Sequence, residues 1–258
     1  MRRLSIPVAV LGFATLFSLA QAQFTPQWQV GDWWVVKEQC PSVIDGAEWQ
    51  LQPWRYDVLG IENVGGHDCF VLQKKVGDTT AAQSGVRNLY CIRMDDWKAI
   101  RRVRYSLRAG KLRGPSTVNY PKGMFGTGRS EPRLPLFPLD TAAVQDSAFR
   151  RYEFPYHGPK LRQFCGLADS AVLNRYLSDP DTSRERPVQL GEGPLIVVLI
   201  EGGAPRDSSV VPATYSLQLW SRDYPWRLYE ERGVYLPGTG VREADSRSWL
   251  IRCGHSEK

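Results

Sequence analysis

The stretch from Trp54 to Lys75, WRYDVLGIENVGGHDCFVLQKK, carries two β-rich runs on either side of the pair Gly65-Gly66. Glycine adopts positive φ angles without steric cost, and a two-residue hairpin turn requires such angles. The stretch therefore predicts a β-hairpin that turns at Gly65-Gly66. Counting outward from the turn predicts three pairs on one face: Ile61 with Phe70, Leu59 with Leu72, and Asp57 with Lys74. The reverse face is predicted to carry Trp54, Tyr56 and Val58 opposite Val71 and Cys69.

Both faces of this predicted hairpin are rich in apolar residues. A sheet with one face in water would carry polar side chains on that face. Two apolar faces need a second packed layer, covering helices, or a curved sheet whose concave side holds a ligand. We therefore expect a mainly β fold, with a single antiparallel, strongly curved sheet or half-barrel and a few short helices. A dry core between two layers is the alternative.

Most of the remaining chain also has β character. Strands are expected at 27–39, 86–94, 99–107, 111–120, 195–200, 214–221, 226–234 and 248–253. Short helices are expected at 140–149 and 169–177, the second with Asp169 as its N-cap. The segment Leu134-Pro-Leu-Phe-Pro-Leu139 is apolar but interrupted by proline, so it cannot form a central strand.

The N-terminus has the features of a secretory signal. Arg2 and Arg3 precede an apolar stretch from Ile6 to Leu19, and Ala20-Gln21-Ala22 is a small-x-small cleavage site. We expect residues 1–22 to be a signal peptide cleaved after Ala22, and residues 23–258 to form a single antiparallel β-rich domain that is secreted or periplasmic. An N-terminal anchor helix is the alternative, but the apolar stretch is short for a membrane span.

The charge of the chain is mildly basic. The formal net charge is +6, and removal of Arg2 and Arg3 leaves +4 (6 minus 2). Such a charge favours weak attraction to anionic surfaces but falls short of a nucleic-acid-binding signature. No nucleic-acid partner is expected, whereas contact with a membrane surface is left open.

Five cysteines follow the predicted signal peptide. In an oxidising compartment cysteines tend to form disulfides. If the strand at 86–94 lies beside the hairpin with Cys91 opposite Cys69, these two can bridge. Two free buried thiols are the alternative, and the pairing of Cys40, Cys165 and Cys253 is open. The three histidines, at positions 67, 157 and 255, show no metal-ligand spacing, so no metal is expected.

Two features are candidates for ligand contact. The first is the apolar face predicted for the hairpin, which carries Trp54, Tyr56, Val58 and Val71. The second is the basic segment 98–113, in which Arg102 and Arg104 project together from a strand and could meet an anionic group. The alternatives are a packed core for the aromatic residues and a solvated strand edge for the arginines.

Enzymatic signals are weak. The stretch 123–128, GMFGTG, lacks the Lys-Ser/Thr of a phosphate-binding loop, and no Gly-x-Ser-x-Gly occurs. Glu201, Glu230 and Glu231 border predicted strands, where ordinary strand-end charges are common. No catalytic residue and no cofactor is therefore expected.

Two stretches resemble the bacterial lipoprotein-carrier type of half-barrel: residues 54–75 with their Val-Gly-Gly turn, and residues 217–230, LQLWSRDYPWRLYE. The resemblance implies a curved antiparallel sheet that helices close over and that holds acyl chains on its concave face. The poorly helical middle of the chain and the proline-rich segment 134–139 differ from that family.

Three functions are compatible with these patterns. The first is a noncatalytic secreted domain that buries an apolar or amphipathic ligand, such as an acyl chain, with Arg102 or Arg104 near an anionic head. The second is a structural or protein-interaction module of the cell envelope with a dry core. The third is a hydrolase whose catalytic residues converge without a local motif. A continuous cavity would favour the first over the second.

Overall fold

The structure is a computed structural model that describes residues 23–41, 49–77, 86–108, 111–124, 132, 134–140, 150–154, 161–178, 186–202, 214–236 and 239–257. The predicted signal peptide and residues 141–149 of the first predicted helix lie outside this part of the chain.

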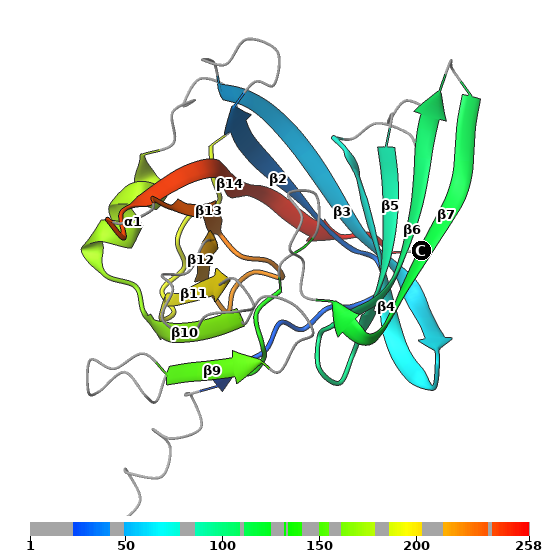
Figure 1. Cartoon of the computed structure of the whole chain (residues 1–258), viewed down its shortest axis with the longest axis horizontal. Helices are drawn as coiled ribbons and strands as arrows, with labels where there is room; N and C mark the ends of the chain where they lie inside the picture. Colours follow the sequence, from blue (N-terminus) through cyan, green and yellow to red (C-terminus); the bar gives the residue numbers. More distant parts are fainter. Residues whose placement is uncertain are drawn as a thin grey trace, which may run out of the picture.

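One antiparallel sheet dominates the molecule (Figure 1). Within the described residues it has twelve strands, in the order β7-β6-β5-β4-β3-β2-β14-β13-β12-β11-β10-β9. The first six in sequence are β2 (Asp32–Pro41), β3 (Trp49–Val64), β4 (His67–Val76), β5 (Val86–Arg93), β6 (Ala99–Arg108) and β7 (Lys111–Met124). The others are β9 (Arg150–Phe154), β10 (Leu161–Leu167), β11 (Ile196–Gly202), β12 (Thr214–Trp220), β13 (Tyr229–Tyr235) and β14 (Arg242–His255). The order runs from β7 to β9 without joining them, so the predicted mainly β, open and curved antiparallel sheet is confirmed.

The sheet consists of two meanders. Strands β2 to β7 pair in sequence order, as do β9 to β14, and the meanders join where β2 pairs with β14. A separate pair is formed by β1 (Gln23–Phe24) and β8 (Leu139–Asp140). The predicted helix at 169–177 is confirmed as α1 (Ser170–Leu177). Its predicted N-cap is confirmed as well, since the Asp169 carboxylate accepts a 2.9 Å hydrogen bond from the Val172 amide.

The central hairpin is partly as predicted. Gly65 and Gly66 have φ angles of 62° and 86°, and Ile61 pairs with Phe70. Beyond Gly60, however, the register shifts because Leu59 is an extra residue in a β-bulge. The predicted pairs Leu59–Leu72 and Asp57–Lys74 are therefore wrong, and the observed partners are Val58–Leu72, Asp57–Gln73 and Tyr56–Lys74.

This bulge changes which side chains share a face. Trp54, Tyr56 and Val58 lie on the face of Leu72 and Lys74, and not opposite Val71 and Cys69 as predicted. We call the face of Leu72 the inner face of the sheet and the opposite one the outer face.

The strand after the hairpin pairs two residues away from its predicted register. Cys91 lies opposite Val71, and Cys69 lies opposite Arg93. The two cysteines are thus diagonal neighbours on the outer face, in a small buried cluster with Val64 and Ile100, and both are free thiols. Diagonal neighbours stand roughly 7–8 Å apart, farther than the usual span of a disulfide. The bridge stays a prediction, and it requires the backbone to move.

Aromatic side chains join the two meanders on the inner face. Trp226, from the turn between β12 and β13, stacks on Trp34 at 5.0 Å and on Tyr56 at 5.1 Å between ring centroids. Trp28 contacts Trp34, Phe70, Trp97 and Trp226. These large buried rings contribute apolar contact between the meanders.

Extended chain, in place of a helical lid, covers this inner face in the described part of the molecule. Phe137 packs edge-on against Trp220 and Trp97, and Leu134 and Leu139 are buried in the same core. The Gln163 side chain holds the segment by accepting from the Leu136 amide (2.7 Å) and donating to the Leu136 carbonyl (3.1 Å). The proline-rich segment therefore packs into the core on the inner face of the sheet.

The middle of the chain was the least predictable. The strands β9 and β10 were not expected from the sequence, because LRQFCGL at 161–167 shows no clean alternation and is short. The expected strands at 99–107, 111–120, 195–200, 214–221 and 248–253 are confirmed within a few residues.

Candidate functional site

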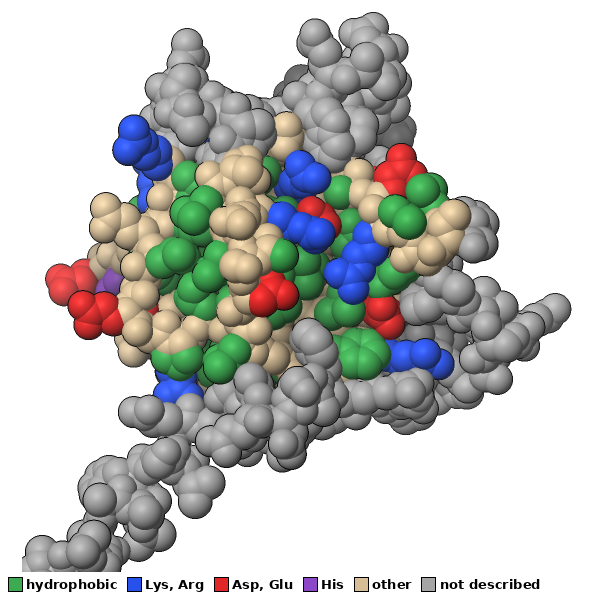
Figure 2. Space-filling view, turned by 90° about the vertical axis from the view of Figure 1, so that its left-hand side faces the viewer, with side chains coloured by type: hydrophobic (Ala, Val, Ile, Leu, Met, Phe, Trp, Pro, Cys, Tyr) green, Lys and Arg blue, Asp and Glu red, His purple; other side chains and the backbone are tan. Residues whose placement is uncertain are grey.

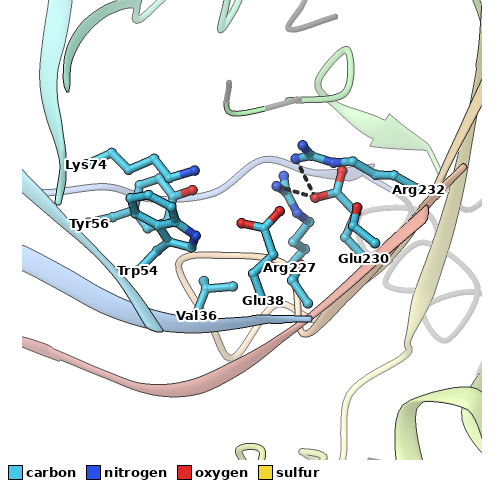
Figure 3. Close-up of a pocket in the computed structure, with 10 residues that line it drawn as sticks. Val36, Glu38, Trp54, Tyr56, Lys74, Arg227, Glu230 and Arg232 are labelled. Atoms are coloured by element: carbon cyan, nitrogen blue, oxygen red, sulfur yellow. Dashed lines mark hydrogen bonds and ion pairs between the residues drawn. The ribbon is translucent and has the colours of Figure 1, made fainter. Parts of the chain in front are cut away.

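A small pocket on the inner face gathers charged side chains from both meanders (Figure 3). Its lining residues are Val36, Glu38, Trp54, Tyr56, Lys74, Arg227, Glu230, Arg232, Ser246 and Ser248. We call this the charged pocket. Its free space is about 10 Å³, close to that of one water molecule.

Strand periodicity places these charges inside. On β2 the inner positions run Trp34, Val36, Glu38, and on β4 they run Phe70, Leu72, Lys74. Each strand is thus apolar on the inner face at one end and charged at the other. The inner face has an aromatic half and a polar half, and the charged pocket lies in the polar half.

Glu230 is the best-connected carboxylate of the charged pocket. It forms ion pairs with Arg227 (2.6 Å) and Arg232 (2.7 Å), and it accepts a hydrogen bond from the Ser216 hydroxyl at 2.8 Å. Only 2% of Glu230 is exposed. A buried carboxylate needs such partners because burial removes its hydration.

Lys74 is the third cation of the charged pocket. It is 3% exposed, and its Nζ stands 4.2 Å from the ring centroid of Trp54 and 5.7 Å from that of Tyr56. Burial lowers the pKa of Lys74 to about 8, although the Glu38 carboxylate acts in the opposite direction. Burial also raises the pKa of Tyr56, so its hydroxyl stays protonated.

A second, apolar cavity of about 430 Å³ lies beside α1. Its lining residues are Tyr176, Leu177, Arg186, Pro187, Val188, Gln189 and Leu190. We call this the α1 cavity. Arg186 is exposed and Leu177 is 66% exposed, so a charge and an accessible apolar side chain border the cavity. Figure 2 shows this side of the molecule, where hydrophobic side chains are exposed between charged ones.

The wall of the α1 cavity is tied to the sheet. Tyr176 donates a hydrogen bond from its hydroxyl to the Val188 carbonyl, and the Val188 amide donates to the Leu250 carbonyl at 3.0 Å. Trp249 donates from its indole to the Tyr176 carbonyl at 3.3 Å. These bonds tie α1 and Val188 to each other and to the sheet.

Glu231 fastens α1 to the outer face. It accepts from the hydroxyls of Tyr215 (2.9 Å) and Tyr229 (3.2 Å), and it pairs with Arg175 of α1 (3.1 Å) and Arg247 (3.3 Å). Because Glu230 and Glu231 are consecutive on β13, their side chains point to opposite faces. The charged pocket and α1 therefore lie on opposite sides of the sheet.

The structure separates the ligand-contact residues predicted from the sequence. Trp54 and Tyr56 line the charged pocket, whereas Val58 is 1% exposed in the aromatic core and Val71 lies on the outer face. Arg102 and Arg104 both project from the inner face of β6, since they pair with Tyr90 and Asn88.

No sequence pattern predicts Arg227, Arg232 or the α1 cavity as functional. The sequence predicts Glu230 to be an ordinary strand-end charge, whereas the structure buries it almost fully. The available signal was a charged residue that continues an apolar alternation, as Lys74 does after Phe70 and Leu72. A buried polar position of that kind indicates a partner from another strand.

Comparisons with known proteins give few further constraints. No model of a protein family and no curated protein matches the chain. Among solved structures, it is similar to a Bacteroides fragilis protein described as exported with a YmcC-like fold, at 13% identity and a TM-score of 0.34. It is also similar to a Parabacteroides distasonis protein described as a lipoprotein, at 10% identity and a TM-score of 0.31. Each comparison covers 90% of this chain and 99% of the other, and likenesses this weak carry no argument about function.

No helix among the described residues is long and apolar enough to cross a membrane. No group of three or more His, Cys, Asp or Glu side chains in that part of the chain could hold a metal ion.

Proposed function

We propose that the chain is an exported, noncatalytic protein that binds an anionic amphipathic molecule with one acyl chain. The observation that carries the proposal is the α1 cavity. Its volume of about 430 Å³ falls within the range of ligand pockets, and most of its lining is apolar. Burial of an acyl chain gains about 25 cal/mol for each Å² removed from water.

Arg186 supplies the preference for an anionic head. It is the charged residue among those that line the α1 cavity, and it is exposed. An acyl chain against Leu177 and Val188 would leave its carboxylate or phosphate at the mouth, within the field of this arginine. This position replaces Arg102 and Arg104, which lie on the other face of the sheet.

Hydrolysis is less well supported. Glu38 and Glu230 both line the charged pocket, which places two carboxylates in one site. Glu230 is already paired with two arginines, and the free space admits about one water molecule. A general acid needs a proton to give, and a substrate needs room to approach.

A fluorescent fatty-acid analogue tests the proposal. We expect it to bind the folded protein and to be displaced by phospholipid. Leu177→Glu removes an apolar contact and places a negative charge at the cavity mouth, where it repels the anionic head, so binding should weaken at least about tenfold, since each 1.4 kcal/mol is tenfold. Leu167→Glu is the matched control, because Leu167 is also exposed, at 49%, but lies outside the cavity lining. A folded wild-type protein that binds neither the fatty-acid analogue nor phospholipid would contradict the proposal and favour a structural or protein-interaction module with a dry core.

Arg186→Gln separates head recognition from chain burial. An exposed ion pair contributes about 0.2–1 kcal/mol, so affinity for the fatty acid should fall up to about fivefold. Affinity for the matching fatty alcohol should not change. Equal loss for both ligands would contradict the assigned role of Arg186.

Export is tested at the N-terminus. Sequencing of the protein isolated from its own cell envelope should begin at Gln23. A protein that retains Met1 or begins within the apolar stretch would contradict cleavage after Ala22.

A further inference from the structure

The large sheet ends at β7, which has β6 as its one neighbour among the described strands (Figure 1). With 14 residues, β7 is a long edge strand. Every second residue of an antiparallel strand turns its N–H and C=O groups away from the neighbouring strand. An edge strand therefore presents a row of backbone groups with which an extended segment of another chain can pair.

The middle of β7 is the regular part of this edge. Residues 116–119 pair with β6 without a shift, whereas β-bulges interrupt the pairing on either side. Residues 113–119 are all exposed. Pro115 and Pro121 bracket the regular part, and proline has no N–H to donate. The bulges and prolines together confine regular strand addition to residues 116–120, which we call the docking edge.

The charge around the docking edge has one sign. The sequences of β6 and β7 contain seven Lys and Arg residues and no Asp or Glu. Arg104 and Arg102 lie on the inner face beside Ser116 and Val118, whose side chains are short. A strand added to β7 would lie two strand spacings, about 10 Å, from β6. An arginine of β6 and a carboxylate of the added strand are together long enough to meet across that distance.

We propose that the docking edge binds an acidic, extended segment of a partner protein by strand addition. The backbone groups of the docking edge supply the pairing, and Asp or Glu at alternate positions of the segment face Arg102 and Arg104. A second copy of this chain fits poorly, because pairing β7 with β7 brings like charges together. Lysine, arginine and proline on an edge strand also oppose self-association.

This surface is separate from the lipid site proposed above. No residue of the docking edge lines the α1 cavity, and neither does Arg102 or Arg104. Failure of lipid binding would therefore leave the docking edge untouched, and the reverse is also true.

Fluorescence anisotropy of a labelled short peptide in which Glu and Val alternate tests the charge requirement. The protein should bind this peptide saturably and should not bind the same peptide with Lys in place of Glu. Arg104→Glu should weaken binding about five- to tenfold, because an attraction becomes a repulsion. Arg252→Glu is the matched control, since Arg252 is exposed on β14 in the middle of the sheet and should bind as the wild type does.

Two further measurements test the backbone pairing. A Glu-Val peptide with N-methylated amides keeps its charge but cannot donate hydrogen bonds from its backbone, so it should not bind. Amide hydrogen exchange of the wild type with the unmethylated peptide should slow within residues 116–120 and stay unchanged in β9, the opposite edge of the sheet. This second measurement does not depend on the folding of Arg104→Glu.

Three results would overturn the proposal. The first is equal binding of the methylated and unmethylated peptides, or exchange in residues 116–120 that the peptide does not slow. The second is a dimer of the protein alone in which these amides are protected, which would assign the edge to a second copy. The third is binding of phosphatidylglycerol vesicles through Arg104 without any binding of the peptide, which would assign the arginines to a membrane surface.

Discussion

At Lys74, burial makes stability depend on pH. The pKa of Lys74 falls from 10.5 to about 8 in the folded protein, so the unfolded chain binds more protons between these values. Stability therefore rises with pH across that window, by on the order of 3 kcal/mol for a shift of this size. The charged or titratable groups that face Lys74 are Glu38, Tyr56, Arg227, Glu230 and Arg232.

The quantity to measure is the difference in the free energy of unfolding between the wild type and Lys74→Met. The wild type should gain stability relative to Lys74→Met as the pH rises from 8 to 10.5, measured by urea unfolding. The difference removes the contribution of tyrosines and cysteines, whose titration both proteins share. A difference that stays constant over this window would show that Lys74 keeps an ordinary pKa.

Glu231 is the residue that fastens α1. Glu231→Gln keeps the shape but removes the charge that Arg175 and Arg247 pair with. Because Glu231 is 4% exposed, the loss should cost about 1–3 kcal/mol in the free energy of unfolding. Glu62→Gln is a control, since Glu62 is an exposed carboxylate 3.7 Å from Arg101 and should change stability little. Equal costs for the two variants would contradict the anchoring role.

At the scale of the strand, β-bulges limit how far the sequence predicts the register of strand pairing. The turn at Gly65-Gly66 follows from glycine alone, and so does the pair Ile61–Phe70. One extra residue at Leu59 then moves Trp54, Tyr56 and Val58 to the other face. The isolated Gly60 is compatible with a bulge at this point, but it does not fix which residue is the extra one. On its observed face Tyr56 stacks against Trp34 and Trp226, which come from distant parts of the chain, so these contacts are not local in the sequence.

The candidate site was less predictable than the fold because it also depends on contacts between strands that are distant in the sequence. Alternation within each strand is a local property, so the strands at 99–107 and 214–221 could be predicted. The charged pocket combines β2, β4, β13 and β14, and only the sheet order brings these together. Arg102 and Arg104 could be placed on one face, but their distance from Lys74, two strands away, depends on the register.

An alanine substitution at Gly233 tests how closely β13 and β14 pair at the bulge that follows Arg232, and the same substitution at Gly60 of β3 is the control. A Cβ on Gly233 would lie 1.9 Å from the Glu243 carbonyl oxygen, so Gly233→Ala forces the strands apart and should cost about 1–3 kcal/mol. A Cβ on Gly60 meets nothing within 4 Å, so Gly60→Ala should change stability by less than about 0.5 kcal/mol. Urea unfolding of both variants gives the comparison. A neutral Gly233→Ala would mean that the two strands are not so closely paired.

At the scale of the whole molecule, the aromatic cluster holds the meanders together. Trp226 is fully buried and contacts rings on Trp28, Trp34, Tyr56 and Trp220. Trp226→Ala should cost about 3–5 kcal/mol in the free energy of unfolding. Trp33→Ala, on the outer face beneath Arg55, should cost less, because Trp33 is only partly buried. Equal costs would show that the cluster does not join the meanders.

The pairing of β2 with β14 also dictates how the chain can fold. Asp32 of β2 and His255 of β14 meet through a 2.8 Å contact although 223 positions separate them. Such a long loop closes slowly, and proteins dominated by distant pairings fold slowly. Before β14 has been synthesised, the edge of β2 that later pairs with β14 is exposed and can pair with another chain. This strand order therefore exposes the newly made protein to aggregation until β14 pairs with β2.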